Sequence, residues 1–305
     1  MGSMNAWEPI AANEPDVRTD AFEVRRPAPA DAPPPTALVF ASPHSGRLYP
    51  PDMMAAAALD AQSIRRSEDA FVDDLIAGAP QWGVTTIAAR YARAYIDLNR
   101  DAFELDPGMF ADELPEFARA RTARVAAGLG AIARVVSEGQ EIYARKLTFA
   151  EARTRIDGAH RPYHETLAAL IGEAHAAHGY AILVDWHSMP AAAARTGGRD
   201  RTCDIVLGDR FGAACAGVLP ARVERELEAL GYRVARNTPY AGGYTTEHYG
   251  RPSRRVHALQ IEINRALYLD EATLTPTAGF EALKADLDRV ARTLAVADWS
   301  ALRAS

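Results

Sequence analysis

Short apolar runs alternate along the chain with longer segments in which apolar residues recur every three or four positions. The short runs predict buried strands, and the recurring positions predict helices over 149–178, 224–230 and 280–294. Strands that alternate with helices predict an α/β protein with a mostly parallel or mixed central sheet and helices on both faces. The predicted strands are 37–41, 84–89, 94–98, 180–184, 204–207 and 257–263.

The longest helical segment carries its own start signal. Thr148 and Glu151 have the spacing of a capping box, in which each side chain bonds the other residue's backbone N–H. Gly158 and Pro162 lie inside the segment, so we expect a kink or a division of the helix near them.

The chain before residue 37 differs in composition from the rest. It is rich in Pro, Ala and charged residues and ends in Pro33, Pro34 and Pro35, which favour extended polyproline geometry. We therefore divide the chain into an N-terminal strap or tail over 1–36 and a single α/β domain over 37–305. Residues 1–3 resemble a vector-derived leader ahead of Met4.

Charge and motif content narrow the classes of function. Lys and Arg total 34 against 40 for Asp and Glu, and this net charge of −6 argues against a nucleic-acid or membrane partner. Cys203 and Cys215 show neither metal-ribbon nor disulfide spacing, and with no signal peptide or membrane span we expect a cytoplasmic protein. Glycine-rich nucleotide loops, the Gly-x-Ser-x-Gly elbow and the His-Glu-x-x-His motif are missing.

Two histidines follow predicted strands directly. His44 lies in a Ser-Pro-His-Ser-Gly loop, and His187 follows the most apolar strand, two residues after Asp185. Each histidine alone is explained by loop capping or by an ion pair. Together, at the carboxyl edge of one sheet, they predict a Zn²⁺ site completed by a carboxylate, with Asp185 orienting His187.

The acidic ligand is sought in the segment that begins at Ser67. Ser67 is predicted as a helix N-cap, with Glu68 and Asp69 in the first helical turn. The helix dipole is a sufficient structural reason for both carboxylates. The functional hypothesis is that one of them, with Asp69 preferred, binds the metal.

A late strand supplies the candidate general base. Gln260, Glu262 and Asn264 share one face of this strand, and Ile261 and Ile263 occupy the other. A glutamate whose pKa rises on burial can deprotonate a water activated by zinc. The competing interpretation is a buried Glu262 paired with an arginine.

Arginines and a glycine-containing loop complete the candidate site. Arg93 and Arg100 flank the 94–98 run, and Arg251 lies later in the chain; their planar guanidinium groups suit a carboxylate substrate. The loop 240–248 contributes Tyr, Thr and His side chains and is a candidate wall of a pocket. His160 and His164 are interpreted as packing or surface residues, because Pro162 lies between them.

Six motifs lie between about residues 39 and 270. They are Ser42-Pro-His-Ser-Gly46, Tyr95-Ile-Asp-Leu-Asn-Arg100, Asp185-Trp-His-Ser188, Tyr240-Ala-Gly-Gly-Tyr244, His248-Tyr-Gly-Arg-Pro252 and His257-Ala-Leu-Gln-Ile-Glu-Ile-Asn264. Together they resemble the N-formylglutamate amidohydrolase (N-formylglutamate deformylase) family. The resemblance implies a phosphorylase/hydrolase-like fold similar to zinc carboxypeptidases, and hydrolysis of N-formyl-L-glutamate to formate and L-glutamate. The family name also suggests histidine catabolism.

The resemblance also implies roles for individual residues. One divalent zinc ion would be held by two histidines and an acidic residue, a glutamate would act as the base, and an Asn-Arg pair would hold a substrate carboxylate. The sequence departs from the carboxypeptidase pattern at Arg47, which stands where that pattern has an acidic ligand. The resulting metal ligands are His44, Asp69 and His187, and Asp185 and Glu68 are expected to contact these ligands. The residues expected in catalysis are Glu262, Arg93 and His248. Those expected to bind the substrate are Asn99, Arg100, Arg251, Tyr240 and Thr245.

Two alternatives stay open at this point. The same site could hydrolyse another N-acyl amino acid, as a metal-dependent amidase or carboxypeptidase-like enzyme. A protein of another class could keep the arginine pocket only to bind a carboxylate ligand. In each case the expected partner is a small molecule, and the expected assembly is a monomer or a small homo-oligomer.

Overall fold

A mixed sheet of eight strands organises the residues that the computed structural model describes, which are 16–27, 33–136, 139–195 and 202–303. The strand order across the sheet is β1-β2-β4-β3-β5-β8-β6-β7, and β9 and β10 form a separate pair. The strands are β1 (Val17–Arg18), β2 (Phe22–Arg25), β3 (Leu38–Ser42), β4 (Thr85–Ala89), β5 (Ala181–Met189), β6 (Ile205–Gly208), β7 (Val234–Arg236), β8 (Val256–Asn264), β9 (Leu269–Asp270) and β10 (Thr275–Pro276).

The centre of this sheet is parallel, and an antiparallel pairing adjoins it on each side. Strands β4, β3, β5 and β8 run in one direction, so their carboxyl ends meet at one edge. Strand β6 runs antiparallel to β8, and β2 runs antiparallel to β4. The prediction of a mostly parallel or mixed sheet is confirmed, and it is the mixed form that is found.

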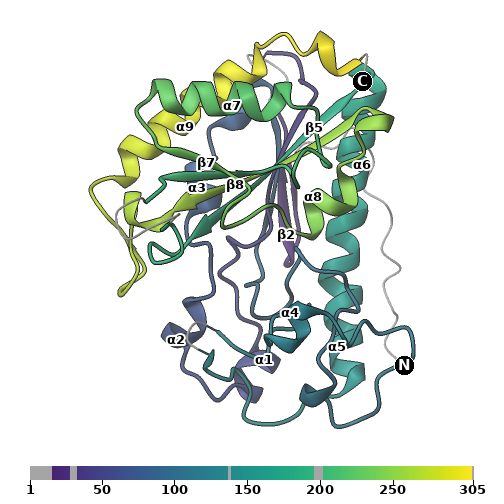
Figure 1. The fold of residues 1–305 in the computed structure, drawn as a ribbon. Helices are drawn as coiled ribbons and strands as arrows, with labels where there is room; N and C mark the ends of the chain where they lie inside the picture. Colours follow the sequence, from purple (N-terminus) through teal and green to yellow (C-terminus); the bar gives the residue numbers. More distant parts are fainter. Residues whose placement is uncertain (1–15, 28–32, 137–138, 196–201, 304–305) are drawn as a thin grey trace.

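Helices cover both faces of the sheet, as predicted (Figure 1). Alternate residues of β3 point to opposite faces: Phe40 packs with α7 and α9, and Val39 packs with α6. In Figure 1, α7 and α9 lie at the upper left and α6 at the right. The α-helices are α1 (Pro51–Ala56), α2 (Ala61–Arg65), α3 (Val72–Leu75), α4 (Ala123–Ala126), α5 (Phe149–Arg155), α6 (Arg161–His178), α7 (Val218–Ala229), α8 (Tyr244–Tyr249) and α9 (Phe280–Ala295).

The long helical segment begins and divides as its sequence predicts. The capping box of Thr148 and Glu151 is present at the start of α5. A π-helical turn, η4 (Ile156–His160), contains Gly158 and separates α5 from α6, which has Pro162 in its first turn. A π turn adds one residue to the helical repeat and changes which side chains share a face after it.

Part of the N-terminal segment that was predicted as a strap or tail contributes two strands to the sheet. Within 16–27, β2 pairs with β4 and β1 pairs with β2, and Phe22 and Val24 are buried. Alternating apolar residues in 22–25 can form a strand because the prolines lie outside them. The proposed leader, residues 1–3, lies outside the described residues.

Three local predictions were wrong. Residues 94–98 form no strand, because they fold into a buried turn in which the Tyr95 N–H bonds the Ala92 carbonyl. Strand β5 does not end at residue 184 but continues to Met189, since its polar residues pair with β8. Ser67 is not an N-cap: its hydroxyl donates to the Ile64 carbonyl at 3.0 Å and closes the end of α2.

Among the described residues, no helix is both long and apolar enough to cross a membrane.

Candidate functional site

The register of the central strands places His187 beside Glu262. These two residues are direct partners in the parallel β5–β8 pair, and Asp185 is likewise the partner of Gln260. Their side chains share one face of the sheet, because Trp186 and Ile261 between them point into the apolar core on the other face. The even-numbered face of β8 thus carries Gln260 and Glu262 to a cavity.

His44 is held by a tight turn after β3. Its backbone carbonyl accepts a hydrogen bond from the Asp69 N–H at 3.0 Å, which brings Asp69 to the same corner. Gly46 is required in this turn, because a Cβ there would lie 2.0 Å from the Tyr91 carbonyl oxygen. The polar residues His44 and Asp69 are therefore positioned by backbone contacts rather than by a regular element.

His44, Asp69 and His187 form a buried cluster at the carboxyl edge of the sheet. The Nδ1 atoms of the two histidines lie 3.1 Å apart. Asp69 Oδ2 lies 3.3 Å from Nδ1 of His44 and 3.0 Å from Nδ1 of His187. Three ligand atoms thus converge on one point from three separate parts of the chain.

Carboxylates stand behind both histidines. Nε2 of His44 lies 2.7 Å from Asp97 Oδ1, and Nε2 of His187 lies 2.9 Å from Asp185 Oδ2. A proton on each Nε2 would face a carboxylate and leave the two Nδ1 lone pairs facing each other. Two imidazoles and one carboxylate with such support are a typical ligand set for Zn²⁺, so these residues fit a divalent cation.

The electrostatics of the cluster follow from its buried carboxylates. Burial alone would lower the pKa of His187, but Asp185, Asp69 and Glu262 raise it well above its usual value. Burial alone would raise the pKa of Asp69, but bonds to His187 and His44 hold it well below its usual value. Without a metal, the cluster therefore favours an ionised Asp69 and a positively charged His187 with a proton on each ring nitrogen.

Glu262 has the properties of a general base. It is buried beside His187, and Gln260 Nε2 donates a hydrogen bond of 2.8 Å to Glu262 Oε1. Burial raises the pKa of Glu262 to about 7. A carboxyl group that titrates near neutral pH can take a proton and return it during one reaction cycle.

A cavity of about 730 Å³ opens over this cluster. Asn99 and Arg100 line it, together with Tyr240 from the loop before α8. The Asn99 amide is oriented because its Oδ1 accepts from the Thr245 N–H at 2.8 Å. Among the described residues, five arginines line the cavity, namely Arg66, Arg93, Arg100, Arg124 and Arg265.

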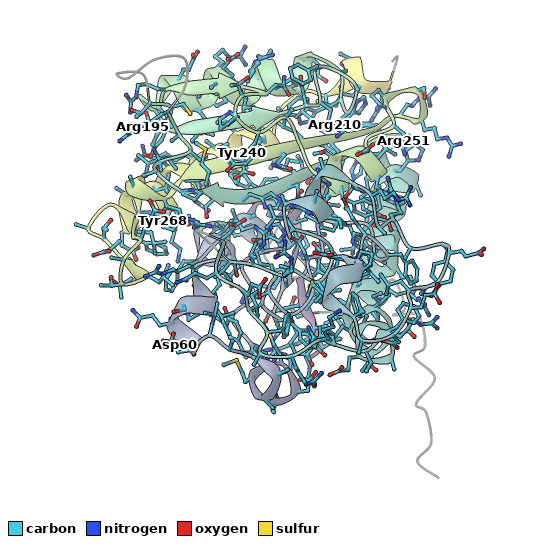
Figure 2. All side chains as sticks on the ribbon, turned by 60° about the horizontal axis from the view of Figure 1, so that its bottom comes forward. Asp60, Arg195, Arg210, Tyr240, Arg251 and Tyr268 are labelled. Atoms are coloured by element: carbon cyan, nitrogen blue, oxygen red, sulfur yellow. The ribbon has the colours of Figure 1, made fainter. Side chains whose placement is uncertain are left out.

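Five of the residues given roles from the sequence do not line the cavity; one is Asp185, which lies behind His187. The Glu68 carboxylate turns away and accepts from the Tyr49 hydroxyl at 2.6 Å. Thr245 is buried behind Asn99, and exposed His248 stacks on Tyr244. Arg251 donates to the Gly250 carbonyl at 2.8 Å; in Figure 2 it lies well to the right of Tyr240.

Three cavity residues were missed in the sequence. Asp97 bridges His44 and Arg93, whose Nη2 donates to Asp97 Oδ2 at 2.7 Å. Arg265 donates from Nη2 to Asp69 Oδ1 at 3.0 Å and fixes the orientation of that carboxylate. Arg124 also lines the cavity. Asp97 and Arg265 had a usable signal, because Asp97 lies within one of the six motifs and Arg265 directly follows another; Arg124 had none.

The π turn and α6 hold the segment that carries Asn99. His160 Nε2 lies 2.9 Å from the Arg100 carbonyl oxygen, and His164 Nε2 lies 2.9 Å from that of Leu98. These histidines therefore bind the backbone on either side of Asn99. They are packing residues, as the sequence indicated, but they pack against the wall of the cavity.

A family model described as N-formylglutamate amidohydrolase matches residues 36–269 of the chain. The chain belongs to the N-formylglutamate amidohydrolase family. Within this family, the N-formylglutamate deformylases of Pseudomonas aeruginosa and Pseudomonas putida are 31% and 30% identical to it over 237 residues. The aligned part is 77% of this chain and 82% of each relative.

Comparison with solved structures agrees with this family membership. The N-formylglutamate amidohydrolase of Ralstonia eutropha JMP134 superposes with a TM-score of 0.85 at 37% identity, over 91% of this chain and 98% of that one. The gene product Atu2144 of Agrobacterium tumefaciens has a TM-score of 0.56 at 18% identity, over 90% of this chain and 94% of that one, and shares the fold. Membership of the amidohydrolase family therefore rests on sequence and structure together.

Proposed function

We propose that this protein hydrolyses the amide of N-formyl-L-glutamate to formate and L-glutamate, with one zinc ion held by His44, Asp69 and His187. Family membership supports the reaction. The observation that carries the proposal is the pair of facing Nδ1 atoms, 3.1 Å apart, with the Asp69 carboxylate against both. This arrangement satisfies a divalent cation, and the base Glu262 lies on the next strand.

A bound zinc ion would polarise the amide carbonyl and lower the pKa of a nearby water. Glu262 takes the proton of the attacking water and delivers it to the leaving nitrogen, which becomes the amine of glutamate. Arg93, held by Asp97, faces the carbonyl oxygen as negative charge develops on it. In this hydrolysis the amide C–N bond breaks, the hydroxyl group of water joins the formyl carbon, and a proton of water joins the amine nitrogen.

Asn99 and Arg100 bind the carboxylate at the amino acid's α-carbon in this proposal. Arg100 Nε donates to the Leu129 carbonyl at 2.9 Å, and its Nη1 donates to the Asn99 carbonyl at 2.8 Å, so the guanidinium plane is held in place. Tyr240 contributes a hydroxyl to the same cavity. We assign no part in substrate binding to Arg251, Thr245 and His248.

The remaining expectations belong to the same proposal. We propose that the enzyme acts in the cytoplasm, in histidine catabolism, as a monomer or a small homo-oligomer. Its partner is a small acidic N-acyl amino acid.

The first test measures metal content and formate release together. The purified protein is assayed with N-formyl-L-glutamate before chelation, after chelation and after zinc is returned. Activity that follows the metal supports the proposal. Bound zinc without formate release would move the search to other N-acyl amino acids, and zinc without turnover of any of them would favour a carboxylate-binding protein.

The second test isolates the base. Glu262→Gln keeps the size of the side chain and removes its ability to accept a proton, so we expect kcat to fall by about 10²- to 10⁴-fold while zinc stays bound. Glu247→Gln is the matched control, because Glu247 lies exposed on α8 and outside the cavity. Full activity of Glu262→Gln would overturn the role of Glu262.

A further inference from the structure

Arg124 lines the same cavity as the metal cluster but differs from the arginines around it. Arg93 is paired with Asp97, and Arg265 is paired with Asp69. For the Arg124 side chain, no hydrogen bond or ion pair is found within 16–27, 33–136, 139–195 and 202–303. As far as the described part of the chain shows, a partly buried guanidinium in a cavity is thus left with its donors available.

The cavity lining carries more positively charged than negatively charged side chains, which favours a ligand with more than one anionic group. Besides the five arginines, the lining includes the carboxyl groups of Asp69, Asp97 and Glu262 among the described residues. Burial lowers the pKa of Arg100, and although Asp97 opposes this shift, the charges of Arg93 and Arg124 lower the pKa further. Arg100 and Arg124, which both line the cavity, therefore repel each other, and a ligand with two carboxylates would relieve that repulsion.

The segment that carries Arg124 is firmly held. Thr122 caps α4, since its hydroxyl oxygen accepts from the Val125 N–H at 3.1 Å, and the same hydroxyl donates to Glu104. The Glu104 carbonyl accepts from the Ala131 N–H at 2.7 Å. At Gly130 a Cβ would lie 2.4 Å from that carbonyl oxygen, so only glycine fits.

The same segment also holds Arg100, through the Leu129 carbonyl. One loop, 122–131, thus sets the positions of two cations that face one cavity. Two cations held in this way suit a ligand whose two carboxylates are separated by a short carbon chain.

We propose that Arg124 binds the side-chain carboxylate of the substrate and makes the enzyme select acidic over neutral N-acyl amino acids. This inference rests on the proposed function and deepens it, because Asn99 and Arg100 then bind the other carboxylate. A planar, permanently charged guanidinium binds a carboxylate through two hydrogen bonds, which an uncharged amide cannot replace.

The test compares two substrates of nearly equal shape, N-formyl-L-glutamate and N-formyl-L-glutamine. In Arg124→Gln we expect kcat/KM for the glutamate substrate to fall about 10- to 100-fold, mainly through KM, and kcat/KM for the glutamine substrate to change less than about threefold. Arg124→Lys should recover part of the loss. Arg121→Gln is the matched control, an exposed arginine of the same segment outside this cavity.

Two outcomes would overturn the inference. They are an equal loss for both substrates and unchanged selectivity. Binding of L-glutamate and L-glutamine by calorimetry gives a reading that needs no turnover: the wild type should prefer L-glutamate, and Arg124→Gln should lose that preference.

The binding measurement also separates the two proposals. If the wild type releases no formate but Arg124→Gln still loses its preference for L-glutamate, the proposed reaction fails and the role of Arg124 stands. If formate is released and the preference is unchanged in the variant, Arg124 has no such role and the reaction stands.

Discussion

Two histidine pairs contact the segment around Asn99, and they share the closeness of their rings but differ in what their nitrogen atoms face. The rings of His44 and His187 are 4.7 Å apart, and those of His160 and His164 are 4.4 Å apart. In the first pair the Nδ1 atoms face each other and carboxylates stand behind them. In the second pair the Nε2 atoms face backbone carbonyls.

The pKa of His187 and the pKa values of the second pair move in opposite directions for this reason. Carboxylates outweigh burial at His187 and raise its pKa. Burial lowers the pKa of His160 and, together with the charge of His160, lowers the pKa of His164 further. Closeness of two imidazoles therefore does not make a metal site. A metal site also needs carboxylates that hydrogen-bond one nitrogen of each ring and free lone pairs on the other nitrogens.

The largest effect should come from removing one member of the first pair, and the same change in the second pair is its control. His187→Ala removes a ligand, so we expect bound zinc to be lost and formate release to fall by about a thousandfold or more. His164→Ala should keep its zinc. Metal analysis of both purified variants measures this, and equal zinc content in the two would erase the distinction between the pairs.

Removing the support behind a ligand should have a smaller effect. In Asp97→Asn, His44 loses the carboxylate that orients it, and we expect zinc affinity to fall about 10- to 100-fold. Competition with a chromophoric chelator measures the affinity. Asp101→Asn, four residues later and outside the cavity lining, is the control. Unchanged affinity in Asp97→Asn would show that the carboxylate does not act through His44.

Acidity should weaken metal binding at the first pair. Zinc requires a neutral His187, whose raised pKa keeps a proton on it in the metal-free protein. Affinity should therefore rise about tenfold per pH unit until the pH passes that pKa, and Asp185→Asn should shift this range to lower pH. The same chelator competition, repeated across pH, measures it. A zinc affinity that stays constant between about pH 6 and pH 8 would contradict the expected rise with pH.

The smallest effect should come from the second pair. His160→Ala and His164→Ala each lose one hydrogen bond to the backbone beside Asn99, worth about 1 kcal/mol. We expect KM to rise about fivefold, with kcat and zinc content nearly unchanged. His175→Ala, on the same helix near the surface, is the control. A fall in kcat alone would show that these histidines act on chemistry rather than on substrate position.

Much of the fold could be predicted because periodic patterns report burial. The 3.6-residue pattern of 280–294 and the capping signal at Thr148 correspond to observed features. The direction of a strand could not be predicted from the sequence, because an apolar run such as 205–208 has the same pattern in a parallel and in an antiparallel strand. The end of β5 was misplaced because its last residues are polar, and their burial depends on the site that they face.

The site could be predicted in part. His44, His187 and Glu262 were found because they adjoin strands, and the sheet brings strand ends together. Adjacent Glu68 and Asp69 could not be told apart, since only the turn between α2 and α3 directs one side chain to the cluster and the other to Tyr49. Arg124 lies in a short helix whose place in space depends on distant contacts with Glu104.

The ligands of the metal cluster are far apart in the sequence. His187 is 143 residues from His44 and 118 residues from Asp69. No short peptide from this chain contains the full ligand set, and during synthesis the site cannot form until β5 has emerged from the ribosome. Contacts of such separation form late in folding, because the entropy of closing long loops must be met first. If the proposed metal binds, its uptake would therefore follow the pairing of β3 with β5, and a filled site would mark a chain in which these two strands have come together.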